Sequence, residues 1–168
     1  MRVSFHKTGP RRYGVRVRRE HASDVEMHPA PAYDDWLPHD LVHFVVERDT
    51  GLRDGIFGQL AAGGDAHTFV PIDEQRTRRW ARRSDRRNAS SGTGIERSER
   101  LAAAAQYRWN VRAGRYHVDV PPDPDLAPDV ESVQATLDEV AEAWHALPVG
   151  EALDLAWPWP ERRRRTSA

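Results

Sequence analysis

Apolar and polar residues alternate along the first twenty residues of the chain, and Thr8-Gly9-Pro10 interrupts the alternation. A period of two with a Gly-Pro break is typical of a β-hairpin. Its apolar positions are Val3, Phe5, Tyr13, Val15 and Val17. Alternation returns near the other end of the chain, in Glu151–Trp157. We expect that segment to join the hairpin in one antiparallel sheet that is covered on one side.

Helical periodicity dominates the middle of the chain. A run of apolar residues spaced three and four apart predicts a helix from about Asp129 to Leu147. Further helices are predicted from about Pro38 to Asp49, over residues 51–64, and after Thr93, where Thr93-x-x-Glu96 fits a capping box. Arg115–Val120 alternates once more and predicts an additional strand.

Together these elements predict an α+β fold, with a small antiparallel sheet (N-terminal hairpin plus C-terminal strand) packed against about four helices. A chain of 168 residues suits one domain, which we place at residues 1–160, with residues 161–168 as a frayed tail. Gly55 and Gly58 weaken the second short helix. We expect them to permit close approach of a neighbouring helix or a ligand.

Composition limits the classes of function. Cysteine is absent, which excludes disulfides and thiolate metal ligands. No apolar run approaches the roughly 18 residues of a membrane span, and the N-terminus lacks the apolar stretch of a secretory signal, so we expect a cytoplasmic protein. The net charge of −1 predicts no general attraction to nucleic acid or membranes. Lys7 is the only lysine among 25 basic residues, a skew typical of GC-rich genomes such as those of actinobacteria.

One segment, at about residues 76–91, is strongly basic. Seven Arg and Trp80 lie between residues 76 and 87, and the low hydrophobicity and like charge predict a mobile loop. Three interpretations stay open: a solvated loop, a surface for an acidic partner or nucleic acid, and neutralisation by residues 119–142, which carry eight acidic and no basic residues. The low net basicity makes nucleic acid the weaker choice of partner.

Candidate chemistry lies on the helix that follows Pro38, in His39-Asp40-x-x-His43. Two His at i and i+4 project from one helix face and can bind one metal ion. At about 100° per residue, Glu47 lies near 80° and Asp40 near 100° from His39, and apolar residues cover the rest of the helix. We predict a divalent-metal site, zinc first, with His39 and His43 as ligands. Asp40 is expected as ligand or catalytic base, and Glu47 as a catalytic residue that orients His43.

A third ligand must come from another part of the chain, because Glu47 is two turns, roughly 12 Å, from His39. The candidates are Asp54, Asp65 and His67, and we place Asp54 first. The same stripe of polar residues has a structural explanation as the wet side of an amphipathic helix. In that case Asp40 is simply a charge that the helix dipole favours.

Several resemblances bear on this helix. The stretch from YDDWLPHDLVHFVVE to GLRDGIFGQLAAGGDAHTF resembles a sequence found in actinobacterial proteins of unassigned function. HDLVH, residues 39–43, resembles the HDxxH helix of an all-helical zinc-binding ubiquinone-biosynthesis family. In that family a Glu follows twelve residues after the second His, where this chain has Gly55 beside Asp54. HDLVH is also similar to the HExxH helix of zincins, and His39-Asp40 to the doublet of HD-type phosphohydrolases. The last two resemblances imply hydrolysis by a metal-activated water.

Three functions fit the sequence. The first is a divalent-metal-binding domain, in its fullest form a metal-dependent hydrolase acting on a small-molecule substrate. The second is a non-enzymatic interaction protein that uses the Arg-rich segment on an acidic partner or nucleic acid. The third is a ligand-binding domain with a pocket between the two short helices, under Trp36 and Phe57.

Overall fold

The computed structural model describes residues 1–31, 36–73, 77–88 and 93–161. One antiparallel sheet has the strand order β4-β3-β2-β1-β5. Its strands are β1 (Arg2–Gly9), β2 (Arg12–Arg18), β3 (Val25–Met27), β4 (Val70–Pro71) and β5 (Ala152–Ala156). The described residues form six helices: α1 (His39–Thr50), α2 (Ile56–Ala61), α3 (Arg78–Asn88), α4 (Gly94–Arg112), α5 (Ala127–Ser132) and α6 (Gln134–Ala146). Four of these helices have seven residues or more, so the predicted α+β fold is confirmed.

The sheet forms as the alternation predicts. Phe5 on β1 lies opposite Val15 on β2 and, on the other side, opposite Leu153 on β5. The C-terminal strand therefore joins the N-terminal hairpin, as expected. All five apolar positions of the hairpin are at most 1% exposed, and they form the covered face.

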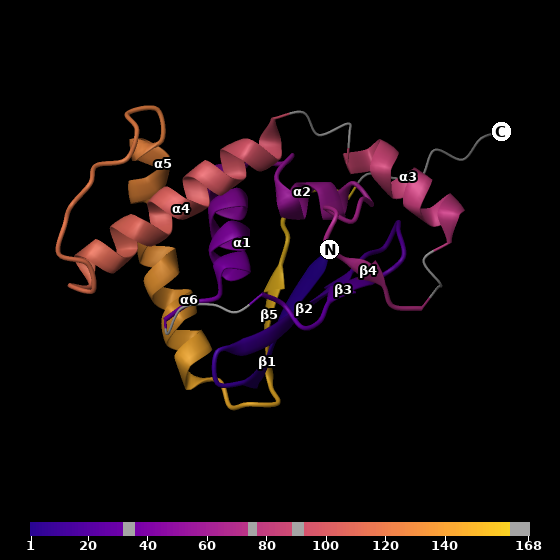
Figure 1. Ribbon diagram of the computed structural model, residues 1–168, viewed down its shortest axis with the longest axis horizontal. Helices are drawn as coiled ribbons and strands as arrows, with labels where there is room; N and C mark the ends of the chain where they lie inside the picture. Colours follow the sequence, from indigo (N-terminus) through magenta and orange to yellow (C-terminus); the bar gives the residue numbers. More distant parts are fainter. Residues whose placement is uncertain (32–35, 74–76, 89–92, 162–168) are drawn as a thin grey trace.

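Helix α1 lies at the centre of the molecule, between the sheet and α4 (Figure 1). Its Phe44 ring meets Phe5 of β1 at 6.0 Å in an edge-to-face contact, while His43 faces α4. Residues 41–47 are all buried, so α1 has no continuous wet side. The amphipathic-helix explanation of its polar stripe is therefore wrong for His43 and Glu47.

Helix α6 packs on the sheet through Trp144, whose ring meets Tyr13 edge-to-face at 6.3 Å. The ammonium group of Lys7 donates hydrogen bonds to the carbonyls of Trp144 and Leu147, at 3.1 and 2.8 Å. These carbonyls lie at the C-terminal end of α6, where few helical N–H groups remain to bind them, and that of Trp144 also accepts the N–H of Leu147 at 3.3 Å. The only lysine of the chain thus caps a helix whose C-terminal dipole favours a cation.

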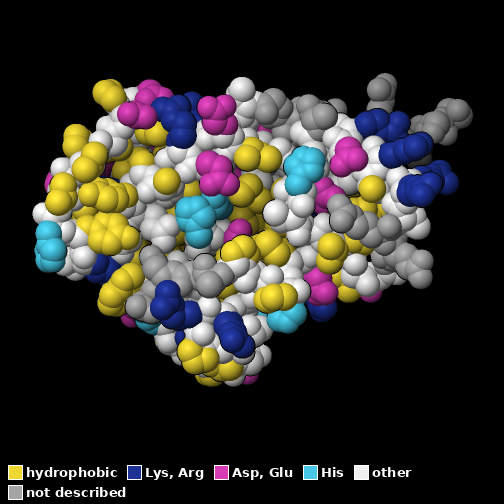
Figure 2. All heavy atoms as spheres, viewed as in Figure 1, with side chains coloured by type: hydrophobic (Ala, Val, Ile, Leu, Met, Phe, Trp, Pro, Cys, Tyr) yellow, Lys and Arg dark blue, Asp and Glu magenta, His cyan; other side chains and the backbone are white. Residues whose placement is uncertain are grey.

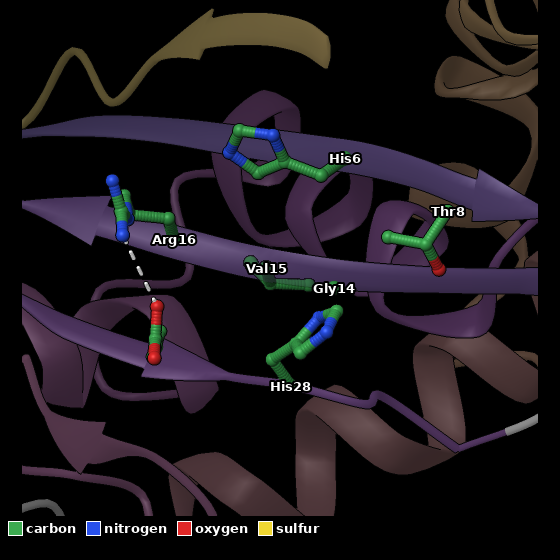
Figure 3. A pocket seen from close by; sticks show the side chains of 7 residues that line it. His6, Thr8, Gly14, Val15, Arg16 and His28 are labelled. Atoms are coloured by element: carbon green, nitrogen blue, oxygen red, sulfur yellow. Dashed lines mark hydrogen bonds and ion pairs between the residues drawn. The ribbon is translucent and has the colours of Figure 1, made fainter. Parts of the chain in front are cut away.

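The other face of the sheet carries polar side chains and a hollow of about 310 Å³ between β1, β2 and β3 (Figure 3). His6 and His28 lie on either side of Gly14, and Arg16 is 3.4 Å from Glu26. The imidazole of His28 covers Gly14 so closely that an added Cβ would lie 2.5 Å from its Nδ1. Within the described residues, no three potential metal ligands converge in this hollow.

The Arg-rich segment is not a loop over residues 78–88, because it forms helix α3. Trp80, Ser84 and Asn88 recur every fourth residue and are buried. The amide oxygen of Asn88 accepts the N–H groups of Asp65 and Ala66, and its NH₂ donates to the Asp65 carboxylate at 2.6 Å. These hydrogen bonds of Asn88 hold α3 in place, and hydrophobic periodicity could not reveal them. Residues 76 and 89–91 of the predicted loop lie outside the described residues.

Three boundary predictions are also corrected. The helix expected over residues 129–147 is broken at Val133 into α5 and α6, although its apolar stripe still faces the core. A strand is absent at Arg115–Val120, because this segment has no partner strand. Its Val118 and Val120 are 65% and 56% exposed. Helix α4 begins after Thr93 as predicted, but the Thr93 side chain makes no capping hydrogen bond.

Glu161, the first residue of the predicted tail, is bound to the N-terminal part of the chain. Its carboxylate accepts the N–H groups of Glu20 and His21 and lies 2.8 Å from the terminal ammonium of Met1. Residues 162–168 lie outside the described residues. Along the described ranges, the helices are all too short or too polar to cross a lipid bilayer.

The docking of α3 can be tested by Asn88→Ala. This change leaves the buried N–H groups of Asp65 and Ala66 without an acceptor, so we expect it to lower the free energy of unfolding by about 1–3 kcal/mol. Arg86→Ala, on the exposed side of the same helix, is the control and should change it by less than about 0.5 kcal/mol. Equal unfolding free energies for the two variants in urea titrations would contradict this placement of α3.

Candidate metal centre

Helices α1 and α4 run past each other in opposite directions, and a series of contacts joins them. Early in α4, Ser98 meets Glu47 near the end of α1. One residue later Glu99 meets His43, and two turns further on Gln106 meets His39 at the start of α1. This arrangement turns the polar stripe of α1 toward α4 rather than toward solvent.

Three potential ligand atoms converge between the two helices. Nε2 of His39 lies 3.2 Å from Nε2 of His43, and Oε2 of Glu99 lies 3.4 Å from the second and 3.9 Å from the first. Metal–ligand bonds of about 2.0–2.2 Å give a tetrahedron with edges of about 3.3–3.6 Å. The His39–His43 and His43–Glu99 separations are within 0.1 Å of that range. A small rotation of the exposed Glu99 side chain shortens the longer His39–Glu99 separation. The described residues contain this group alone as a set of three such ligands.

One side of the group is open to solvent. The side chains of His39 and Glu99 are 45% and 55% exposed, whereas that of His43 is 2% exposed. A structural zinc site normally has four protein ligands and is closed, while a catalytic site has three and an open position. The exposure and the number of ligands are both those of an open site.

Hydrogen bonding fixes the protonation of His43. Both carboxylate oxygens of Glu47 accept hydrogen bonds, and Ser98 Oγ donates to Oε1 at 2.6 Å. Since its proton points to Glu47, the Ser98 hydroxyl can only accept from His43 Nδ1, which lies 2.8 Å away. While Glu47 is ionised, Nδ1 of neutral His43 therefore carries the proton, and the lone pair is on Nε2, directed at His39.

His39 is oriented in the same way. Its Nδ1 lies 2.8 Å from the amide oxygen of Gln106, which can only accept, so Nδ1 carries a proton here as well. Both neutral imidazoles then direct a lone pair into a space of 3.2 Å. Two facing lone pairs repel each other, so this spacing favours a cation between them, either a proton or a metal ion. Such hydrogen bonds to the distal nitrogen are characteristic of metal-binding histidines.

Glu47 also fixes the position of α2. Its carboxylate accepts the N–H groups of Ile56, Phe57 and Gly58 at 2.7, 2.8 and 3.3 Å, the first N–H groups of that helix. Gly55 makes this approach possible, because a Cβ at that position would lie 2.4 Å from the carboxylate. The expectation that Gly55 permits contact with a neighbouring helix is confirmed.

A buried cation holds the opposite end of α2. The guanidinium of Arg19 donates to the carbonyls of Leu60 and Gly64 at 3.0 and 2.7 Å. Burial lowers the pKa of Arg19 to about 10, which leaves it charged at neutral pH. Charges of opposite sign at the two ends match the dipole of this short helix.

Electrostatic effects on the two glutamates differ. Burial raises the pKa of Glu47 to about 7, and its hydrogen bonds with Ser98 and the backbone of α2 oppose that rise. The neighbouring His43 imidazole is the largest effect that lowers the pKa of Glu99. Glu99 is therefore anionic at neutral pH and available as a metal ligand.

Other residues expected at the site lie elsewhere. Asp54 does not join the histidines: it is exposed, and its carboxyl lies against Gly94 at the start of α4. Asp65 is bound to Asn88, and Asp40 accepts a hydrogen bond from Tyr13 of β2. His67 is exposed beyond α2. The structure thus brings Glu99 to the position for which we had placed Asp54 first.

The candidate-site residues that the sequence did not reveal are all on α4. Glu99 and Gln106 are seven residues apart, so they lie on the same side of this helix. Ser98 lies in a buried stripe with Leu101, Ala102, Ala105 and Trp109. The polar Ser98 at an otherwise apolar position was the one indication in the sequence. Its role becomes clear only from the packing of α4 on α1.

No protein-family model matches this chain, and neither a curated protein nor a solved structure matches it. The resemblances of the His39-Asp40-x-x-His43 helix therefore stay predictions. What can be said of the site rests on its own residues and geometry.

Gly55→Ala tests the packing of Glu47 against α2. The added methyl group would overlap the Glu47 carboxylate and displace it, so we expect a loss of about 1–3 kcal/mol in the free energy of unfolding. Gly9→Ala is the control, since its Cβ would lie 3.8 Å from the nearest atoms, an ordinary contact. A Gly55→Ala variant as stable as Gly9→Ala in chemical denaturation would show that Glu47 does not occupy this position.

Proposed function

We propose that this protein binds one zinc ion through His39, His43 and Glu99 and uses the open side of the site for hydrolysis. The observation that carries the proposal is the convergence of two Nε2 lone pairs and one carboxylate oxygen, with both Nδ1 atoms held as donors. A solvated helix face gives no reason for either the convergence or the fixed protonation.

The kind of ligands favours zinc. Two imidazoles and one carboxylate form a common ligand set of catalytic zinc, whereas Mg²⁺ and Ca²⁺ prefer oxygen ligands. The same set binds Fe(II) in oxygenases, so iron must be measured together with zinc. Because the imidazoles bind as neutral ligands, a metal ion here takes the place of the proton between them.

Each protein residue has a distinct part in the proposed reaction. Zinc bound in such a site lowers the pKa of a bound water to about 7 and so supplies hydroxide at neutral pH. Glu99 and His39 line the open side, where substrate can approach. Glu47 and Ser98 act through His43 as positioning residues. Asp40 has no part in this proposal, because its carboxylate is bound to Tyr13.

Metal analysis of untagged protein tests the binding step. We expect about one zinc or iron per chain in the wild type, and loss of most of it in Glu99→Gln, which removes the anionic ligand. Glu96→Gln, an exposed carboxylate on the same helix, and Asp54→Asn are the controls and should retain the metal. Wild-type protein that is metal-free and cannot be reconstituted would contradict the proposal, as would equal metal loss in all three variants.

A purely structural role for the two histidines gives a different result. In that case a chelator should leave the melting temperature of the wild type unchanged. If the metal is bound, the chelator should remove a stabilisation of about 2.7 kcal/mol at a free-metal concentration one hundred times the dissociation constant. His39→Gln/His43→Gln should then melt like chelated wild type and no longer respond to the chelator.

The hydrolytic step needs a separate measurement. We expect the zinc-loaded protein to hydrolyse an activated ester or phosphodiester at a rate that rises with pH through about 7, as the bound water loses a proton. A chelator and Glu99→Gln should abolish the activity, and Glu96→Gln should retain it. Hydrolysis that is insensitive to the chelator would refute the catalytic part of the proposal.

A further inference from the structure

Within the described residues, the acidic segment at residues 119–142 forms ion pairs with α4 rather than with the Arg-rich segment. Four arginines of α4 bind it, at distances of 2.8–3.3 Å for the closest pair of each. The pairs are Arg97–Asp129, Arg100–Asp123, Arg108–Glu131 and Arg112–Asp138. The arginines of α3 must therefore be explained in another way.

Four arginines of α3 make no hydrogen bond or ion pair with any residue that the structure describes. They are Arg78, Arg79, Arg82 and Arg86, and all four are exposed. Together with Asp85 they line an open hollow of about 700 Å³. In Figure 2, Lys and Arg side chains gather over α3 at one end of the molecule. We call this set of four arginines the α3 basic face.

The basic face is preorganised by the side of α3 that is bound to the protein. Trp80, Ser84 and Asn88 are buried beneath it, and Arg87 donates to the carbonyl of Gly63 at 2.8 Å. Arg78, Arg82 and Arg86 follow one another at i, i+4 and i+8, so successive guanidinium groups are spaced by about one helical turn, roughly 6 Å. Three of the four cations are thus displayed in one row on a fixed helix, and Arg79 lies beside the first of them.

We propose that the α3 basic face binds the sugar–phosphate backbone of double-stranded nucleic acid, without reading its bases. Guanidinium groups bind phosphates by paired hydrogen bonds, and such contacts need no apolar surface. The large hydrophobic side chains that are exposed in the described residues all lie outside α3. Stable protein interfaces usually contain aromatic anchors beside their arginines, and the basic face displays arginines alone.

The burial of Trp80 favours double-stranded over single-stranded nucleic acid as the ligand. Proteins that bind single strands stack the bases on exposed aromatic rings. Trp80 is the aromatic residue of α3, and it is 5% exposed, so it cannot serve as such a platform. The net charge of −1 is no obstacle, because local charge decides the attraction within about 10 Å at ordinary ionic strength.

Binding of a short fluorescent DNA duplex to the full-length protein tests this inference. Four phosphate contacts predict that log Kobs falls with log salt concentration with a slope of about −3.6, roughly a 150-fold loss between 50 and 200 mM salt. Arg82→Gln/Arg86→Gln should reduce the slope to about −1.8. Asp85→Asn should strengthen binding, because it removes the one negative charge within the basic face.

Arg97→Gln/Arg100→Gln is the matched control. It removes the same charge from arginines that already have carboxylate partners, so the slope should stay near that of the wild type. Failure to bind the duplex at 50 mM salt, or equal effects of the two double variants, would overturn the inference. Tighter binding to phosphatidylserine vesicles than to the duplex would overturn it in favour of a membrane surface. Glu99→Gln should bind DNA like wild type, so this test is independent of the metal site.

Discussion

Glu47 is fully buried, and its carboxylate accepts three consecutive backbone N–H groups of α2 and the hydroxyl of Ser98 on α4. A carboxylate without partners in such a place would cost several kcal/mol or would hold its proton. The partners must therefore be in position whenever the chain is folded. This requirement fixes α2 and α4 relative to α1. Gly55 is part of the same constraint, because only a residue without Cβ leaves room for the carboxylate.

The same hydrogen bonds govern the chemistry of the neighbouring site. Ser98 can accept from His43 Nδ1 only while it donates to Glu47, and this direction leaves the Nε2 lone pair of neutral His43 free. Protonated Glu47 can instead donate to Ser98. Ser98 then donates to Nδ1 of His43, and the proton of the neutral imidazole lies on Nε2. Burial holds the pKa of Glu47 near 7, so both directions are accessible close to neutral pH. A metal ion on His43 selects the ionised form of Glu47.

Periodicity in the sequence was sufficient for β1, β2 and β5 and for the boundaries of α1, because each of these elements buries an apolar pattern of its own. It did not reveal the short strands β3 and β4. It failed where polar residues determine the packing. Helix α3 is held by the hydrogen bonds of Asn88, and its six arginines give it the composition of a loop. The segment at Arg115–Val120 alternates without a partner strand, and a partner cannot be read from local sequence.

The sequence likewise predicted only part of the candidate site. His39 and His43 could be found from their spacing on one helix, because four residues complete about one turn. Their partners on α4 are more than fifty residues away, so only the packing of two helices brings Glu99, Ser98 and Gln106 to them. Asp54 was favoured because it is near in sequence. In the fold it lies beyond the end of α1 that is distant from His39.

A crystal structure of the zinc-loaded protein, with anomalous diffraction collected at the zinc edge, is the most direct test of the metal centre. The account requires one strong anomalous peak about 2.0–2.2 Å from Nε2 of His39, Nε2 of His43 and a carboxylate oxygen of Glu99. It also requires that Nδ1 of His43 remain within hydrogen-bonding distance of Ser98. An anomalous map without a peak between α1 and α4, or with zinc bound only at other side chains, would contradict it.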